Sequence, residues 1–236
     1  MMEKEPYIIC ITEQKEIAQE MKQKGFPVIA LLNDSNRNDL TFIPYAIEDL
    51  SVLTDDYLSM VWHHTKGIPR KIAETNRLMI RELAKQDAAG MEHLCEDPSV
   101  SSFFPEYYEN RSDLEEYLDQ YCKRMYDFLG YGYWGIICKE TEELIGIVGF
   151  HGGELEDGVE IGYAIRSDYQ RNGYAYEACR EVLAYAKKMI DIQKVYAIID
   201  ETNEASERLC LKLGFKCISR LREGKYLLVY SNFALE

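Results

Sequence analysis

Hydrophobic and polar positions alternate in short blocks over the first 70 residues. Residues 7–12 (YIICIT) and 26–32 (FPVIALL) are uninterrupted apolar runs with the length of buried strands. The residues between them carry apolar side chains at helical spacing, and this pattern ends at Gly25. A strand, a helix and a strand in so short a span predict a βαβ unit with parallel strands. A further helix is predicted at 54–62, and a Gly-Ile-Pro break then indicates a domain boundary within residues 67–75.

The rest of the chain shows a longer succession of alternating and helical patterns. Strands are predicted at 77–83, 133–138, 144–150, 159–165, 195–199, 216–220 and 226–230. Helices are predicted at 85–94, 111–129, 174–190 and 204–213. Short polar breaks between the middle strands are typical of antiparallel hairpins. We therefore divide the chain into a small α/β domain over residues 1–70 and a larger α+β domain over residues 76–236.

Composition narrows the class of protein. The 236 residues include 47% hydrophobic and 29% charged side chains, which is ordinary for a globular protein, and the formal net charge is −14. Nucleic acids and anionic membranes favour basic surfaces, so we expect neither as a partner. An acidic surface suits a cationic substrate, although it more often confers only solubility. No apolar run is long enough to span a bilayer and the first residues do not resemble a signal peptide, so we expect a cytoplasmic protein.

Cysteine and histidine positions give no sign of a metal site. The seven cysteines fall within apolar patterns without any C-x-x-C pair, and we interpret them as buried, reduced thiols. His63 and His64 are adjacent on a predicted helix, where neighbouring side chains do not face each other, and no third ligand has a suitable spacing. His151 precedes two glycines and is interpreted as a loop residue, with a position close to the binding pocket as the alternative. No bound metal is predicted.

The stretch QRNGYA at 170–175 joins the strand at 159–165 to the following helix. Backbone N–H groups in a tight turn at a helix N-terminus can bind an anion. Gly173 permits a positive φ and a close backbone approach, Ala175 keeps the first helical turn uncrowded, and Arg171 adds positive charge. The stretch is neither a P-loop nor a Rossmann fingerprint. An ordinary strand-to-helix turn is the alternative interpretation of these residues alone.

The strand before this turn has an unusual face. In VEIGYAI, the residues Glu160, Gly162 and Ala164 share one side, because successive side chains in a strand point to opposite faces. Two very small residues beside one carboxylate fill a core poorly, and they suit a surface against which an extended molecule lies. Further along the chain, Asn203 and Ser206 begin the next helix, for which Asn203 is a good N-cap.

Several stretches together resemble the acetyl-CoA-binding core of the GNAT N-acetyltransferase superfamily. They are, in chain order, RLMIREL at 77–83, Asp97-Pro98-x-Val100, QRNGYA at 170–175, Asn203-x-x-Ser206 and KLGF at 212–215. The first two resemble the RimJ/RimL-like branch, which acetylates protein N-termini and assorted small amines. The resemblance covers about residues 76–232. It implies a GNAT fold, with a mixed, mostly antiparallel central sheet flanked by helices, and acetyl-CoA as co-substrate.

The resemblance also implies roles for particular residues. The pyrophosphate of CoA is expected on the N–H groups of the QRNGYA loop, with pantetheine along the end of the preceding strand. Asn203 is expected to contact the pantetheine arm, and its alternative role is the helix N-cap. The residues expected to contact the cofactor are Ile165, Gln170, Arg171, Asn172, Gly173, Tyr174, Ala175 and Asn203.

The catalytic groups are expected nearby. Glu160 stands where family members often hold a general base; a strand glutamate that binds neighbouring backbone or points to solvent is the alternative. Many relatives carry a tyrosine where this chain has Cys210, so the proton donor to the leaving thiolate is expected to be Ser206 or water. Aromatic residues before the long helix either line the acceptor site or pack in the core; they are Phe104, Tyr107 and Tyr108.

The predicted function follows from these motifs. We expect an acetyl-CoA-dependent N-acetyltransferase that moves the acetyl group to a primary amine, on a protein N-terminus or a small molecule, by direct attack. A non-catalytic acetyl-CoA-binding sensor is the alternative. Residues 1–70 resemble part of a haloacid-dehalogenase-like domain, but Ile11, Thr12 and Glu13 stand where its D-x-D nucleophile would be, so an accessory role is expected. The acceptor amine is left open, as is the oligomeric state, for which a homodimer is one option.

Overall fold

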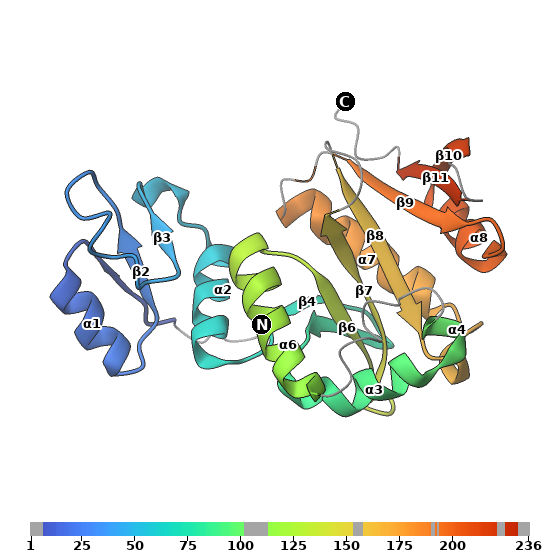
Figure 1. Ribbon diagram of the computed structural model, residues 1–236, viewed down its shortest axis with the longest axis horizontal. Helices are drawn as coiled ribbons and strands as arrows, with labels where there is room; N and C mark the ends of the chain where they lie inside the picture. Colours follow the sequence, from blue (N-terminus) through green and yellow to red (C-terminus); the bar gives the residue numbers. More distant parts are fainter. Residues whose placement is uncertain are drawn as a thin grey trace. The chain divides into compact units, whose positions relative to one another are not determined.

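The computed structural model describes residues 7–101, 113–152, 158–189, 192, 194–220 and 225–230. The chain forms two compact units, Met1–Arg70 and Lys71–Glu236. Figure 1 labels the helices and strands of both. None of the described helices combines the length and the apolar character needed to cross a membrane.

The first unit contains the expected parallel βαβ arrangement. Its elements are β1 (Cys10–Thr12), α1 (Lys15–Gln23), β2 (Val28–Leu31), β3 (Ala46–Ile47), η1 (Leu50–Val52) and α2 (Asp55–Lys66). The three strands are parallel in the order β1-β2-β3. Neighbouring residues of β2 point to opposite faces, so that Val28 and Ala30 pack with Ala18 of α1, while Ile29 packs with Val61 of α2. The very short β3 was not predicted.

The second unit is built on one large sheet. Its strands are β4 (Lys71–Glu74), β5 (Leu78–Glu82), β6 (Tyr133–Cys138), β7 (Leu144–Gly152), β8 (Val159–Ile165), β9 (Val195–Asp200), β10 (Phe215–Arg220) and β11 (Lys225–Tyr230). Its helices are η2 (Lys85–Asp87), α3 (Ala88–Glu96), α4 (Pro98–Ser101), α6 (Leu114–Cys122), η4 (Lys123–Leu129), η5 (Ser167–Tyr169), α7 (Tyr174–Met189) and α8 (Glu204–Leu213). The strand order is β10-β11-β9-β8-β7-β6-β5-β4, and every neighbouring pair is antiparallel except β8 and β9. The predicted mixed, mostly antiparallel sheet is confirmed.

Two expected elements differ in detail. Strand β4 lies within the stretch that we interpreted as a break between domains, where it pairs with β5 across an irregularity after Lys71. Its four residues are too few for a clear alternating pattern, and the preceding Gly-Ile-Pro suggested a linker instead. The long helix predicted at 111–129 is described from Leu114 and changes into wider π-helical turns at Lys123, ending at Gly130.

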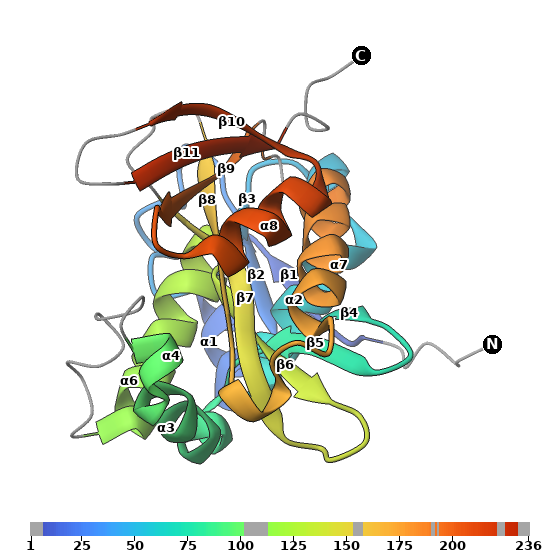
Figure 2. The same cartoon turned by 90° about the vertical axis from the view of Figure 1, so that its right-hand side faces the viewer.

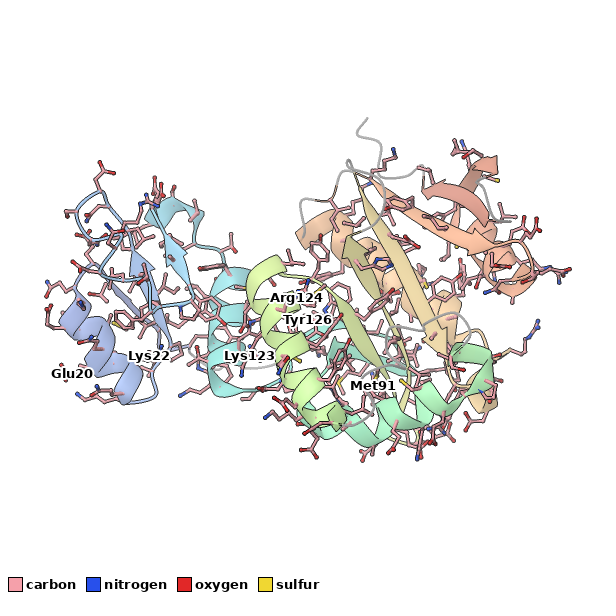
Figure 3. The ribbon with its side chains drawn as sticks, in the orientation of Figure 1. Glu20, Lys22, Met91, Lys123, Arg124 and Tyr126 are labelled. Atoms are coloured by element: carbon pink, nitrogen blue, oxygen red, sulfur yellow. The ribbon has the colours of Figure 1, made fainter. Side chains whose placement is uncertain are left out.

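Helices cover both faces of this sheet and enclose two cores. Figure 2 shows α7 on one side and α3, α4 and α6 on the other. The core under α7 includes Trp134, Phe150 and Val182, which are all fully buried. The opposite core includes Met91 of α3 (labelled in Figure 3) and Leu118 of α6. Strand β8 contributes to both cores, and this central place positions its residues for the site described next.

Candidate functional site

The sheet opens between β8 and β9. Within the described strands, two residue pairs join them, Val159 with Val195 and Glu160 with Tyr196. Beyond these pairs the two parallel strands spread apart (Figure 1). Residues 161–165 of β8 and 197–200 of β9 line a cavity of about 870 Å³. Strand backbone groups without a ladder partner need another hydrogen-bonding partner, so the opening offers two strand edges to a ligand.

The small-residue face of β8 is partly filled by an aromatic ring. A Cβ atom added to Gly162 would lie 2.1 Å from the hydroxyl oxygen of Tyr133, so only glycine leaves room for this ring. Ala164 packs in the same core as Tyr133. We expected this face to be bare for an extended ligand, and this expectation was wrong in part, because the ring of Tyr133 covers Gly162. The sequence did not reveal this contact, because Tyr133 on β6 is remote from β8 in the chain.

The loop before α7 has an unusual backbone. Arg171 and Gly173 both have positive φ angles, +63° and +82°, and the value at Gly173 matches the expectation from the sequence. The first N–H that donates to a carbonyl at this helix start is that of Glu177, which binds Gly173 O at 3.1 Å. Among the described residues, no acceptor lies at the N–H groups of the preceding turn, residues 174–176. These N–H groups carry the positive end of the helix dipole and can bind an anion.

Two side chains of the loop brace it from within. The amide of Gln170 donates to Ile165 O at 2.8 Å and to the hydroxyl of Ser99 at 2.9 Å. The amide of Asn172 donates to Tyr169 O at 3.2 Å and to Gln170 O at 3.1 Å. Both side chains therefore hold the loop in shape, and the carbonyl of Ile165 already has a partner.

Arg77 reaches this loop from the far end of the sheet. It immediately precedes β5, and its guanidinium donates to Asn172 O at 3.1 Å and through Nε to Glu177 Oε2 at 2.9 Å. The guanidinium also lies 4.4 Å from the ring centre of Tyr174. A Cβ on Gly173 would be 3.7 Å from Arg77 Nη2, so the cation borders the loop. We expected Arg77 as the start of a strand and of the RLMIREL motif but not at this loop, because nothing in the sequence links it to residues about one hundred positions away.

Charge around the loop is balanced by this contact. Hydrogen bonding to Glu177 raises the pKa of Arg77 above its usual value. Although burial opposes its ionisation, hydrogen bonds from Thr75 and Arg77 hold the pKa of Glu177 below its usual value. The acidic side chain in the first turn of α7 is thus neutralised by Arg77, which keeps the turn suited to an anion.

The opposite side of the cavity holds Glu160 and His151. The two residues are cross-strand neighbours on β8 and β7, with His151 Nε2 4.0 Å from Glu160 Oε1. About 17% of the Glu160 side-chain surface is exposed. His151 Nδ1 lies 3.1 Å from Gly152 O, and its ring centre lies 5.6 Å from that of Tyr133. His151 is not a loop residue, because β7 continues through the glycine that suggested a turn, and the alternative position close to the pocket is confirmed, since His151 lines the cavity.

Helix α8 closes the cavity from the side of β9. Asn203 caps this helix, since its side-chain oxygen accepts the N–H of Ser206 at 3.1 Å. Ser206 lines the cavity, and its carbonyl accepts the hydroxyl of Tyr163 at 3.2 Å. The Tyr163 hydroxyl is also 3.5 Å from the Cys210 sulfur. Burial raises the pKa of Cys210 to about 11.

The sequence also singled out three aromatic residues and the histidines His63 and His64. Phe104, Tyr107 and Tyr108 lie outside the described residues. His63 belongs to α2 of the first unit, where its Nδ1 lies 2.7 Å from Ser59 O. No group of three or more histidine, cysteine, aspartate or glutamate side chains in the described parts of the chain is arranged to hold a metal ion.

Comparison with known proteins identifies relatives of the second unit. Residues 77–216 match the family model described as an acetyltransferase (GNAT) domain. The uncharacterized N-acetyltransferase YoaA of Bacillus subtilis is 33% identical over 158 residues, which cover 66% of this chain and 88% of the relative. The family match begins at residue 77, and the haloacid-dehalogenase resemblance expected for residues 1–70 finds no support in these comparisons.

Solved structures share the fold. An acetyltransferase of the GNAT family from Bacillus anthracis superposes with a TM-score of 0.56 at 22% identity, covering 66% of this chain and 95% of the other. The structure of RimL, a ribosomal L7/L12 alpha-N-protein acetyltransferase, gives a TM-score of 0.59 at 13% identity and covers 70% and 94% of the two chains. At these identities the similarity shows the fold alone.

Proposed function

Because the chain belongs to the GNAT acetyltransferase family, we propose that it moves the acetyl group of acetyl-CoA to a primary amine by direct attack of the amine on the thioester. One observation carries the proposal. A single cavity is lined at one end by the loop before α7, with Arg171, Gly173 and Ala175, and at the other end by Glu160. It joins a site for an anionic group to a carboxylate across the opened edge of the sheet.

The residues present fit an elongated, anionic cofactor. The N–H groups around Gly173 meet no acceptor among the described residues, Arg171 places positive charge beside them, and Arg77 neutralises the nearby Glu177. We propose that the pyrophosphate of acetyl-CoA binds these N–H groups, from Arg171 to Ala175. The pantetheine arm then runs along the spread edges of β8 and β9. Asn203 uses its side-chain oxygen as a helix cap, which leaves its amide group to donate to that arm.

Glu160 is the proposed general base. Its carboxylate is partly buried and borders the cavity, where it can accept a proton from the attacking amine directly or through one water. Holding amine and thioester side by side converts the reaction into an effectively intramolecular step. His151, next to Glu160, lines the same end of the cavity. The RimJ/RimL-like motifs support a primary amine as acceptor, on a protein N-terminus or a small molecule.

Release of CoA tests the proposed function. The full chain is incubated with acetyl-CoA and a panel of peptide N-termini and small amines, and the free thiol is measured with DTNB. We expect thiol release that depends on an amine of the panel. Binding of acetyl-CoA by calorimetry without release for any amine would favour a non-catalytic sensor instead.

Glu160→Gln tests the proposed base. The amide keeps the shape of the side chain and removes its basicity, so kcat should fall about 10²- to 10⁴-fold with little change in acetyl-CoA affinity. Higher pH should restore part of the activity, because more of the amine is then unprotonated. Glu140→Gln, an exposed change in the turn after β6, is the matched control and should keep kcat. A kcat within about twofold of the parent would exclude Glu160 as the base.

A further inference from the structure

Two proton-carrying side chains of β8 line the cavity from opposite faces of the strand. They are Glu160 and Tyr163, whose odd spacing places them on different sides. Glu160 lies on the face shared with Gly162 and Ala164. Tyr163 lies on the face toward α8, where its hydroxyl donates to Ser206 O at 3.2 Å and lies 3.5 Å from Cys210 Sγ. The proposed mechanism so far gives Tyr163 no part.

The departing thiolate of CoA needs a proton, and the groups around α8 differ as donors. Cys210 is fully buried, so its thiol is sequestered from the cavity. Ser206 carries an aliphatic hydroxyl, which is a far weaker acid than a phenol. Tyr163 is a phenol, whose ordinary pKa of about 10 makes it a much stronger acid than the serine hydroxyl.

We propose that Tyr163 is the catalytic acid of this chain, donating its hydroxyl proton to the sulfur of the departing CoA. This inference rests on the proposed acetyltransferase function. Many relatives carry a tyrosine where this chain has Cys210. Tyr163 of β8 places its phenol beside that position. The sequence pointed instead to Ser206 or water as the donor.

The hydrogen bonds of Tyr163 leave its proton available. In an α-helix the carbonyl of Ser206 also accepts the N–H of residue 210, so the phenol is only its second donor. At 3.2 Å and 3.5 Å, both contacts of the phenol are long, and turning the hydroxyl toward a sulfur in the cavity sacrifices little. Burial raises the pKa of Tyr163 well above its usual value and so weakens it as an acid, but the same burial also raises the pKa of a thiol beside it, so that a thiolate there becomes a stronger proton acceptor.

Another buried tyrosine shows what a purely structural phenol looks like. Tyr126 (labelled in Figure 3) accepts the N–H of Leu83 at 3.1 Å and donates to Tyr133 O. Both hydrogen-bonding functions of this hydroxyl are engaged by backbone, and Tyr126 is not among the residues that line the cavity. Tyr163 differs on both counts, because it borders the cavity and its partners are a shared carbonyl and a thiol.

The reaction balances with these two groups. The amine nitrogen loses a proton to Glu160 and forms a bond to the carbonyl carbon of the thioester, whose π electrons move to oxygen. When the C=O bond reforms, the C–S bond breaks and its electron pair goes to sulfur, which takes the proton of Tyr163. The products are the acetylated amine and CoA with a free thiol. Glu160 then returns its proton to solvent, and the Tyr163 phenolate takes one up.

The positions of the two groups fit this sequence of steps. Nucleophile and leaving group occupy different sides of the reacting carbon, and the spread edge of β8 lies between the Glu160 face and the Tyr163 face. A thioester held at this edge would have the base on the side of the amine and the acid on the side of the sulfur.

The test compares two tyrosine-to-phenylalanine variants of the full chain. Tyr163→Phe removes the acid and keeps the ring, so kcat should fall about 10²-fold or more at saturating acetyl-CoA, with acetyl-CoA affinity within about twofold of the parent. Tyr126→Phe is the matched control, because it also removes a buried phenol. It should lower the melting temperature and leave kcat within about threefold. A Tyr163→Phe variant with kcat within about twofold of the parent would overturn the proposal.

A second donor substrate separates chemistry from structure. An aryl thioester such as S-acetyl-4-nitrothiophenol releases an acidic thiol that leaves without a proton. The ratio of parent to Tyr163→Phe activity should therefore fall close to one with this donor. An equal loss with both donors would show that the phenol acts only on structure. If the parent chain binds acetyl-CoA but none of the amines causes thiol release, the proposed function is overturned. The proposal of a catalytic acid falls with it.

Discussion

The two helices that follow the spread strands begin in different ways. Helix α8 is capped by its own chain, since the side chain of Asn203 accepts the N–H of Ser206. Helix α7 begins after Gly173, and the N–H groups of its first turn meet no acceptor among the described residues. An uncapped helix start is normally unfavourable, and its position beside the cavity supports the proposed binding of the pyrophosphate there. The comparison separates a helix start that is capped by its own chain from one that is proposed to be capped by the cofactor.

Changing the uncapped start should have the largest effect. A ligand present at 100 times its dissociation constant stabilises the folded state by about 2.7 kcal/mol. In Gly173→Asp the side chain places a negative charge at the proposed phosphate site, at a positive φ that non-glycine residues rarely adopt. We expect acetyl-CoA to cause no thermal shift in this variant.

Gly173→Ala is the matched control for this prediction. A Cβ at this position meets only Arg77 Nη2, at 3.7 Å, so alanine adds backbone strain without charge or a clash. We expect the variant to lose about 1 kcal/mol of stability and to keep a measurable shift with acetyl-CoA. A full shift in Gly173→Asp would mean that the loop before α7 is only a turn.

Removing the contacts of Arg77 with the start of α7 should have a smaller effect. Arg77→Met breaks the bonds to Asn172 O and Glu177, leaving the Glu177 charge uncompensated beside the proposed anion site. Hydrogen bonds to charged groups contribute about 1.5–3 kcal/mol, so the acetyl-CoA dissociation constant should rise about tenfold in calorimetry. Arg180→Met removes an exposed arginine of the same helix, which pairs with Glu181, and should change the constant less than twofold. An equal loss of acetyl-CoA affinity in both variants would show that Arg77 acts only through its charge and not through these hydrogen bonds.

The capped start should give the smallest change. Asn203→Ala removes the cap of α8 and should lower the free energy of unfolding by about 1 kcal/mol in chemical denaturation. Asn203→Ser restores a capping oxygen without the amide, so stability should return. Acetyl-CoA affinity in Asn203→Ser then reports on the amide alone. Parent-like affinity in that variant would remove Asn203 from the proposed cofactor site.

Local signals in the sequence predicted the elements and the loop. The spacing of apolar residues located the long helices, and a glycine between polar residues predicted the positive φ at position 173. These features depend on residues close together in the chain. Arg77, His151 and Tyr163 escaped a functional assignment because their partners lie far away in sequence or on another strand, where no periodicity connects them.

The opening between β8 and β9 was also beyond the reach of pattern analysis. Both strands carry a clear strand pattern, and nothing in that pattern states how many residues of one pair with the other. The length of a ladder depends on the twist of each strand and on the bulk packed between them. The expectation of a bare face around Gly162 failed for a related reason, since Tyr133 comes from another strand.

Because the ladder between β8 and β9 is short, the sheet is open between these two strands over most of their length. Strands β9, β10 and β11 are joined to the remaining five through the two residue pairs at one end of this junction. We expect hydrogen exchange to show β9 and its neighbours opening at a lower free-energy cost than global unfolding, because few backbone pairs join them to β8. A ligand bound between β8 and β9 would supply hydrogen-bonding partners for their unpaired backbone groups. It would thereby connect the two parts of the sheet. Binding of the proposed cofactor at this opening should therefore slow hydrogen exchange in β9 and its neighbours.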